Sequence, residues 1–219
     1  VTVYVGASVG YRLILGASSG TSTITGYLRA RGGEAGATVT DGGALSVAGT
    51  TRLALSDRDV TLDHASNNLQ GPLKIQADAV SVTHPTALTL GDSTIDETYD
   101  IRTTTGNITD SIGGTLTVTG NSTFTTDADG ADITLNTPTN AFGTPTLGTV
   151  TVNTVGTGGD AEVHGGSTNL KIIASGGVGT LKLTTTGADI TDSGALVVLG
   201  ATTIDAGGAD VTLNHGSSN

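Results

Sequence analysis

The sequence of 219 residues predicts an all-β protein, specifically a parallel β-helix in which successive coils of chain stack on one another. Three observations lead to this prediction. Apolar and polar residues alternate with period two through almost every segment. One pattern occurs three times, so that a long repeat of roughly 75 residues runs along the chain. Glycine is abundant, with 34 residues, while aromatic residues make up only 3%.

Short strands with one buried face are expected wherever the alternation is regular. They are expected at residues 1–6, 11–16, 115–120, 149–154, 161–165, 180–187 and 195–200. Gly, Asn, Asp and Ser cluster between these runs, as turns require. No window of the sequence favours an amphipathic helix of useful length.

Three segments carry the recurring pattern: Val39–Asp63, Ile108–Asn136 and Ile190–Asn214. Their lengths differ only in Gly-rich turns, which a solenoid tolerates because each turn of chain contacts only its neighbours. If a coil takes about 18 to 20 residues, the long repeat holds four coils and the chain about eleven to twelve, a rod of about 50 to 55 Å. The core would be thin and filled by Val, Ile, Leu and Ala.

Two other β architectures fit less well. Propeller blades repeat every 40 to 50 residues with aromatic signatures, and sandwiches bury large aromatic residues. We therefore expect a single β-helix domain over residues 1–219, with long repeats at approximately 36–107, 108–186 and, in part, 187–219. The chain is repeat-like from its first residue and has neither an initiating Met nor a signal peptide, so we expect a segment of a longer protein.

The charge of the chain argues against several classes of partner. The net charge is −11, and the nine basic residues are scattered along the sequence. Nucleic acid binding requires a concentrated basic surface, so we expect no nucleic acid partner. The apolar runs are too short for membrane insertion. The absence of Cys excludes disulfides and thiolate metal sites.

Three elements of the repeat carry a resemblance to a known family: "DITLNTPTNAFG" at 132–143, "ALTLGDST" at 87–94 and "ITDSGALVVLGATT" at 190–203. Together they resemble the repeat region of filamentous-haemagglutinin-like proteins, which are very large bacterial exoproteins typically secreted by the two-partner route. The resemblance covers about residues 36–219. It implies a right-handed β-helix that serves as a long extracellular shaft, secreted or held at the bacterial cell surface.

Recurrent polar residues are the first candidates for a site. Asp41, Asp110 and Asp192 occupy the same position in the three copies. Recurrence at the repeat spacing indicates a structural role, such as a side chain that caps backbone N–H groups of a turn. For the same reason Asn67 and Asn140 are interpreted as turn-stabilising residues.

A weak candidate for Ca²⁺ binding is formed by Asp127, Asp129 and Asp132 in "DADGAD". A calcium loop of the helix-loop-helix type needs a further bidentate acid, and none follows. A solvated turn is the preferred interpretation, and we expect no metal and no cofactor. His64 and His215 hold equivalent positions and are expected to be exposed turn residues.

The sequence offers no catalytic residue. Many β-helices cleave acidic polysaccharides, but that chemistry needs carboxylates and cations that converge in one groove. Lys74, Lys171 and Lys182 look isolated, and Arg58 and Arg102 lack an evident partner cluster. A flat Thr array for ice binding is disfavoured because the coil length varies. We therefore predict that the chain is not an enzyme.

The function expected is that of a shaft segment in a secreted or cell-surface bacterial adhesin. The alternative is a self-assembling extracellular fibre subunit that stacks head to tail, because unpaired strand edges favour pairing. The expected partners are neighbouring coils of the same or identical chains, and a host or neighbouring-cell surface. Binding is expected in loops such as 92–100 or 153–167.

Overall fold

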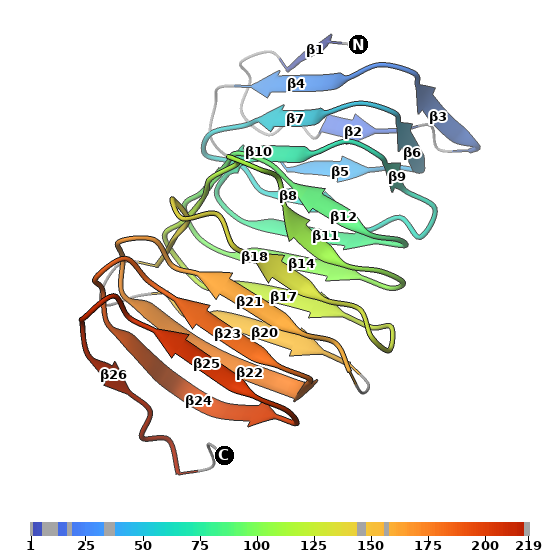
Figure 1. The fold of residues 1–219 in the computed structure, drawn as a ribbon. Coiled ribbons are helices and arrows are strands. Elements are labelled where there is room, and N and C mark those ends of the chain that lie inside the picture. Colours follow the sequence, from blue (N-terminus) through green and yellow to red (C-terminus); the bar gives the residue numbers. More distant parts are fainter. Residues whose placement is uncertain are drawn as a thin grey trace.

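The chain folds, in a computed structural model, as a parallel β-solenoid whose turns stack along one axis (Figure 1). The structure describes residues 2–5, 13–16, 19–32, 38–143, 148–155 and 158–216. These residues contain no helix, and every printed strand pair is parallel, as the all-β prediction requires. Residues 1, 6, 11 and 12 of the expected strands lie outside the described part of the chain.

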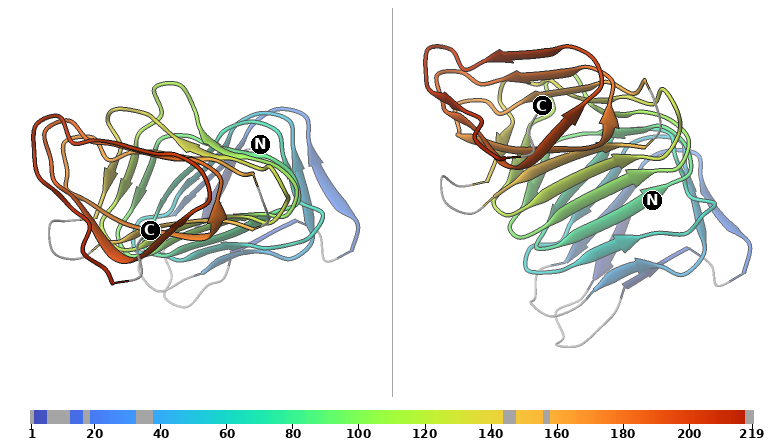
Figure 2. Two further views of the ribbon diagram at one scale, coloured as in Figure 1. Left: turned by 60° about the horizontal axis from the view of Figure 1, so that its bottom comes forward. Right: turned by 90° about the horizontal axis from the view of Figure 1, so that it is seen from below.

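Two large sheets form the long sides of the solenoid. The path of the first sheet runs through β1 (Thr2–Val5), β4 (Leu28–Gly32), β7 (Thr51–Ala54), β10 (Leu73–Ala77), β12 (Leu88–Leu90), β15 (Ile108–Asp110), β18 (Ile133–Leu135), β21 (Ala161–His164), β23 (Leu181–Thr184) and β25 (Thr202–Asp205). The second sheet consists of β2 (Leu13–Leu15), β5 (Val39–Asp41), β8 (Val60–Leu62), β11 (Val80–His84), β14 (Tyr99–Thr103), β17 (Ser122–Thr126), β20 (Val150–Thr154), β22 (Leu170–Val178), β24 (Ile190–Val198) and β26 (Val211–Thr212). Viewed toward the ends of the stack, the turns enclose an elongated ring (Figure 2).

Short strands complete the cross-section at its narrow sides. A third sheet consists of β3 (Thr21–Ile24), β6 (Ala44–Val47) and β9 (Asn68–Leu69). Three further short strands attach to the first sheet beside its main path: β13 (Ser93–Ile95), β16 (Leu116–Val118) and β19 (Ala141–Phe142).

The turns are longer and fewer than the sequence predicted. The pairing that starts at Leu28 and ends at Ile204 closes eight turns over 176 residues, an average of 22 residues a turn. Single turns range from 17 residues, between Leu73 and Leu90, to 28, between Ile133 and Ala161. The prediction of eleven or twelve coils was therefore wrong, and about eight turns are present. The excess residues lie in corners and short strands, which strand alternation does not register.

This turn length changes how the repeats stack. At 22 residues a turn, a repeat of roughly 75 residues makes about three and a half turns instead of four. Equivalent positions therefore alternate between the two large sheets. Asp41 ends β5 in the second sheet, Asp110 ends β15 in the first, and Asp192 lies in β24, again in the second. Successive copies thus present the same pattern on opposite sides of the solenoid.

The interior is filled by stacked apolar side chains. One column of the second sheet is buried throughout and consists of Leu62, Val82, Ile101, Phe124, Val152 and Ala174. Tyr99 and Phe142 both pack edge-to-face near Phe124, with ring centroids at 5.8 and 6.1 Å from it (Tyr99 and Phe142 respectively). The aromatic cluster lies beside the longest turns, where the ring encloses more volume. The core is therefore not uniformly thin, as the low aromatic content had suggested.

Candidate functional site

The recurrent Asp residues join adjacent turns. The carboxylate of Asp41 accepts the N–H of Asp63 at Oδ1 (3.3 Å) and the N–H of His64 at Oδ2 (2.9 Å). Asp63 lies 22 residues further along the chain, which is one turn of the solenoid. The side chain therefore supplies acceptors for backbone N–H groups at the corner of the next turn.

Asn67 completes this arrangement from the corner of that next turn. Its Nδ2 donates to Oδ2 of Asp41, and its Oδ1 accepts the backbone N–H of Leu45 on β6 (3.0 Å). The side chain is buried, with 2% of the residue exposed. A buried amide is tolerated when its polar atoms are paired, and here both are.

The second copy repeats the same geometry on the opposite sheet. Asp110 accepts the N–H groups of Asn136 (3.3 Å, Oδ1) and Thr137 (3.0 Å, Oδ2). Asn140 donates to Oδ2 of Asp110 at 2.8 Å and accepts the N–H of Leu116 at 2.9 Å. Sequence analysis named Asp110 and Asn140 separately, and the structure brings them together as one pair.

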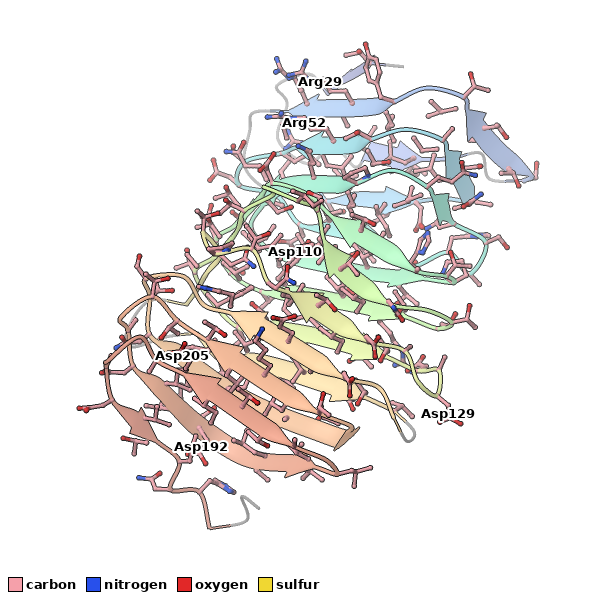
Figure 3. The ribbon with its side chains drawn as sticks, viewed as in Figure 1. Arg29, Arg52, Asp110, Asp129, Asp192 and Asp205 are labelled. Atoms are coloured by element: carbon pink, nitrogen blue, oxygen red, sulfur yellow. The ribbon has the colours of Figure 1, made fainter. Side chains whose placement is uncertain are left out.

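The third copy shows the first half of the pair. Asp192 accepts the N–H of Asn214 at Oδ1 and that of His215 at Oδ2, both at 3.1 Å. Residue 218, which corresponds to Asn67, lies outside the described residues. Asp110 and Asp192 are labelled in Figure 3, where they lie on separate turns of the stack.

A longer ladder of Asp and Asn side chains was missed by sequence analysis. Each residue lies directly before a strand, and its Oδ1 accepts the N–H of the equivalent residue one turn later. On the first sheet the series is Asn107, Asp132, Asp160 and Thr180, with distances of 3.0, 2.9 and 2.7 Å. On the second sheet it is Asn169, Asp189 and Asp210, both distances being 3.1 Å. The signal that could have revealed it is Asp or Asn recurring at the turn spacing before a strand.

The calcium candidate is not assembled into one set of ligands. Asp127 forms an ion pair with Arg102, at 2.8 Å between Oδ2 and Nε, and Asp132 belongs to the ladder just described. Asp129 is exposed and lies at the tip of a loop (Figure 3). Among the described residues, no group of three or more His, Asp and Glu side chains is placed to hold a metal ion.

Two lysines that looked isolated in the sequence have partners one turn away. Lys74 Nζ lies 2.6 Å from Asp92 Oδ2, and Lys182 Nζ lies 2.7 Å from Glu162 Oε1. The interpretation of these two as isolated was wrong, because stacking brings together residues that are 18 and 20 positions apart.

His84 is a buried polar residue that sequence analysis did not single out. Its Nε2 accepts the N–H of Leu69 at 3.0 Å, and its Nδ1 lies 2.9 Å from the carbonyl oxygen of Thr86. This arrangement fits a neutral ring with the proton on Nδ1. Burial lowers the pKa of His84 below its usual 6.5.

Three segments of the chain, residues 13–76, 77–153 and 146–219, match one family model. The model is described as repeats of unknown function (DUF5649). The chain belongs to this family. The matched segments span 64, 77 and 74 residues, close to the long repeat recognised in the sequence. No curated protein and no solved structure matches the chain.

The comparisons therefore support a repeat protein with a β-solenoid fold. They contain nothing that concerns filamentous haemagglutinin or two-partner secretion. In the described part of the chain, no helix is long and apolar enough to span a membrane.

Proposed function

We propose that this chain is a segment of a structural shaft in a secreted or cell-surface bacterial exoprotein. In this role it has no catalytic activity and extends a binding or effector tip. The observation that carries the proposal is the continuity of the first sheet, which runs through ten strands from β1 to β25. Every turn is bonded along the axis to the next, so the fold adds length with each repeat.

The inter-turn side chains support the same role. Backbone ladders bind the flat sides of each turn, and the Asp and Asn side chains bind the corners, where backbone N–H groups would otherwise lack acceptors. The result is a stack that is bonded both on its faces and at its edges. The net charge of −11 would keep neighbouring shafts from associating laterally.

Labelling of whole bacterial cells tests the proposal. Antibodies raised against this solenoid should label intact cells and lose their signal after external protease treatment. Electron microscopy of the purified full-length protein should show the epitope along a rod. Labelling that appears only after cell lysis would contradict the proposal.

A self-assembling fibre subunit is the second candidate. The last described turn exposes apolar side chains, among them Leu199 at 62% and Val211 at 45%. A further turn, either of the same chain or of a second copy, would cover them. Sedimentation velocity of the full-length native protein separates the two functions: a fibre subunit grows with protein concentration, whereas a covalent shaft keeps a constant mass.

A further inference from the structure

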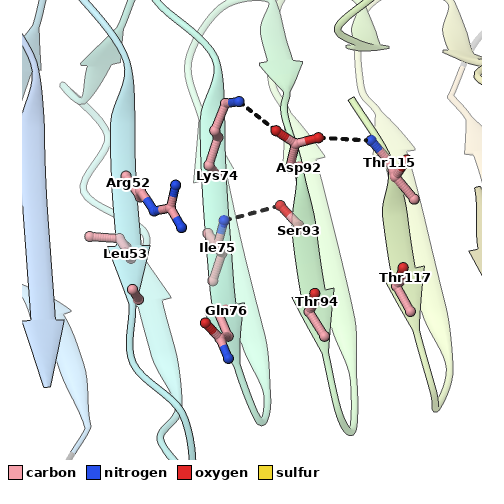
Figure 4. Close-up of a pocket in the computed structure, with 11 residues that line it drawn as sticks. Arg52, Leu53, Lys74, Ile75, Gln76, Asp92, Ser93, Thr94, Thr115 and Thr117 are labelled. Carbon is pink, nitrogen blue, oxygen red and sulfur yellow. Dashed lines mark hydrogen bonds and ion pairs between the residues drawn. The ribbon is translucent and has the colours of Figure 1, made fainter. Parts of the chain in front are cut away.

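A polar groove crosses four successive strands on the outer face of the first sheet. It lies over β7, β10, β13 and β16 and has a volume of about 200 Å³ (Figure 4). Strands in a sheet are about 4.8 Å apart, so the groove extends about 14 Å along the solenoid axis.

A β-bulge shapes the groove. β10 pairs with β12 through Leu73 and Leu90, an offset of 17, and with β13 through Gln76 and Thr94, an offset of 18. One extra residue is therefore accommodated between β12 and β13. Ser93 compensates for the interrupted ladder, since its buried hydroxyl accepts the N–H of Ile75 at 3.0 Å. Bulges of this kind redirect the neighbouring side chain.

The redirected side chain is that of Asp92. Its Oδ2 lies 2.6 Å from Nζ of Lys74, and its Oδ1 accepts the N–H of Thr115 at 3.2 Å (Figure 4). Both interactions lower the pKa of Asp92, with the Lys74 hydrogen bond as the larger cause. Asp92 thus holds the ammonium group of Lys74 at the edge of the groove.

Arg52 supplies a second cation, and it has no carboxylate partner within the described part of the chain. Arg29, Arg52 and Lys74 are register partners on β4, β7 and β10, so three of the nine basic residues stack in adjacent turns. Figure 4 shows the guanidinium of Arg52 extending from β7 toward β10. Like charges stacked across strands are destabilising on their own, and an anion would relieve the repulsion.

The remaining lining consists of neutral hydrogen-bonding groups. Gln76, Thr94 and Thr117 form one register column of exposed side chains beside the cations. No aromatic side chain lines the groove. A ligand suited to this surface carries an oxyanion at one side and several hydroxyl groups at the other.

We propose that this groove binds an acidic saccharide. The carboxylate of a uronic acid unit pairs with Arg52, whose planar fork of donors matches a carboxylate, and with Lys74. The hydroxyl groups of the sugar bond to the column of Gln76, Thr94 and Thr117. This site goes beyond the role of a shaft and does not depend on it.

Titration calorimetry with trigalacturonate at low ionic strength tests the proposal. The fully methyl-esterified trisaccharide is the matched neutral ligand, and inorganic phosphate is the matched simple anion. We expect trigalacturonate to bind at millimolar concentration or better and to bind more tightly than either control. Arg52→Gln should weaken its binding by about tenfold or more, because a charge-assisted pair is lost.

Lys171→Gln is the matched variant, because it removes one positive charge from an exposed position on the second sheet. It should leave the affinity within about twofold, which distinguishes a local site from net charge. Thr94→Val should weaken trigalacturonate but not phosphate. Circular dichroism checks that each variant is folded, as expected for exposed positions.

Four outcomes would overturn the proposal. They are no binding of trigalacturonate, an equal loss in Lys171→Gln, equally tight binding of the methyl ester, and phosphate binding as tight as that of the trisaccharide with no effect of Thr94→Val. The last outcome would indicate a site for oxyanions in general.

Discussion

At the scale of single residues, the corners of the solenoid depend on paired Asp and Asn side chains. Asn140 is buried, with 1% of the residue exposed, and its amide bridges Asp110 and the backbone of Leu116. Asp110 in turn accepts two backbone N–H groups from the following turn. Removal of one member leaves the other with unpaired polar atoms in a place that water reaches poorly, and this is the costly event.

We expect Asp110→Ala to lower the free energy of unfolding by about 2 to 4 kcal/mol. The loss reflects three hydrogen bonds to one carboxylate, from Asn136, Thr137 and Asn140. Urea denaturation measures it. Glu97→Ala is the control, because this exposed carboxylate accepts no recorded hydrogen bond, and it should change stability by less than about 0.5 kcal/mol. Equal effects of the two variants would contradict the assigned role.

His84 makes stability depend on pH. Its pKa is lowered in the folded state, so below pH 6.5 the unfolded chain takes up a proton that the folded chain does not. Its contribution is complete above that value and is lost as pH falls toward the lowered pKa, at no more than about 1.4 kcal/mol per pH unit. Protonation would also remove the acceptor for the N–H of Leu69.

Urea denaturation at several values between pH 7.5 and 5.5 checks this prediction. The parent protein should lose stability toward the acid end of the range. His84→Asn should be less stable at pH 7.5 and should show a flatter profile. If both proteins gave parallel profiles, the dependence would have to arise from other groups.

At the scale of elements, stacked glycines let the turns approach at one corner. Gly26, Gly49 and Gly71 precede β4, β7 and β10 by the same short interval. A Cβ added to Gly71 would lie 2.5 Å from the carbonyl carbon of Gly49, and one added to Gly49 would lie 2.9 Å from the oxygen of Gly26. These neighbours are backbone atoms, which cannot move aside without disturbing the ladder.

Gly71→Ala should therefore lower the free energy of unfolding by about 2 kcal/mol or more, because it overpacks backbone against backbone. Gly26→Ala is the matched control in the same column. There an added Cβ meets no described atom within 4 Å, so the change should be neutral or slightly stabilising. Thermal or urea denaturation of the two variants compares them. Similar losses at both positions would show that close stacking is not the cause.

At the scale of the whole molecule, the turn length sets how much each repeat contributes to length. Three and a half turns of about 4.8 Å add about 17 Å per repeat, whereas four turns would add about 19 Å. Ten strands along the first sheet span about 43 Å by the same spacing, shorter than the rod expected from the sequence.

Tandem proteins with three, six and nine repeats should increase in length by about 50 Å for each three repeats added. Cryo-electron microscopy of the particles measures the increment. The half-turn offset also places equivalent surface residues of adjacent repeats on opposite sides. Labels attached at equivalent exposed positions should therefore alternate between the two faces; labels that all lie on one face would contradict this geometry.

The alternation of apolar and polar residues determined the all-β class and the parallel stacking, because alternation is local and fixes which face of each strand is buried. Expected strands such as 149–154 and 180–187 overlap β20 and β23. The repeat also pointed to Asp41, Asp110, Asn67 and Asn140 as residues of one kind. Recurrence reveals shared local surroundings, whatever the path of the chain between copies.

Only the tertiary structure decided the number of residues in a turn, and much else depends on that number. It decided that Asn140 reaches Asp110, that Lys74 meets Asp92, and that successive copies face opposite sides. Turn length is set by how the interior is filled, as by Phe124 among the longest turns, and by what each corner requires. These are contacts between residues about 20 positions apart, and a pattern with period two carries no information about them.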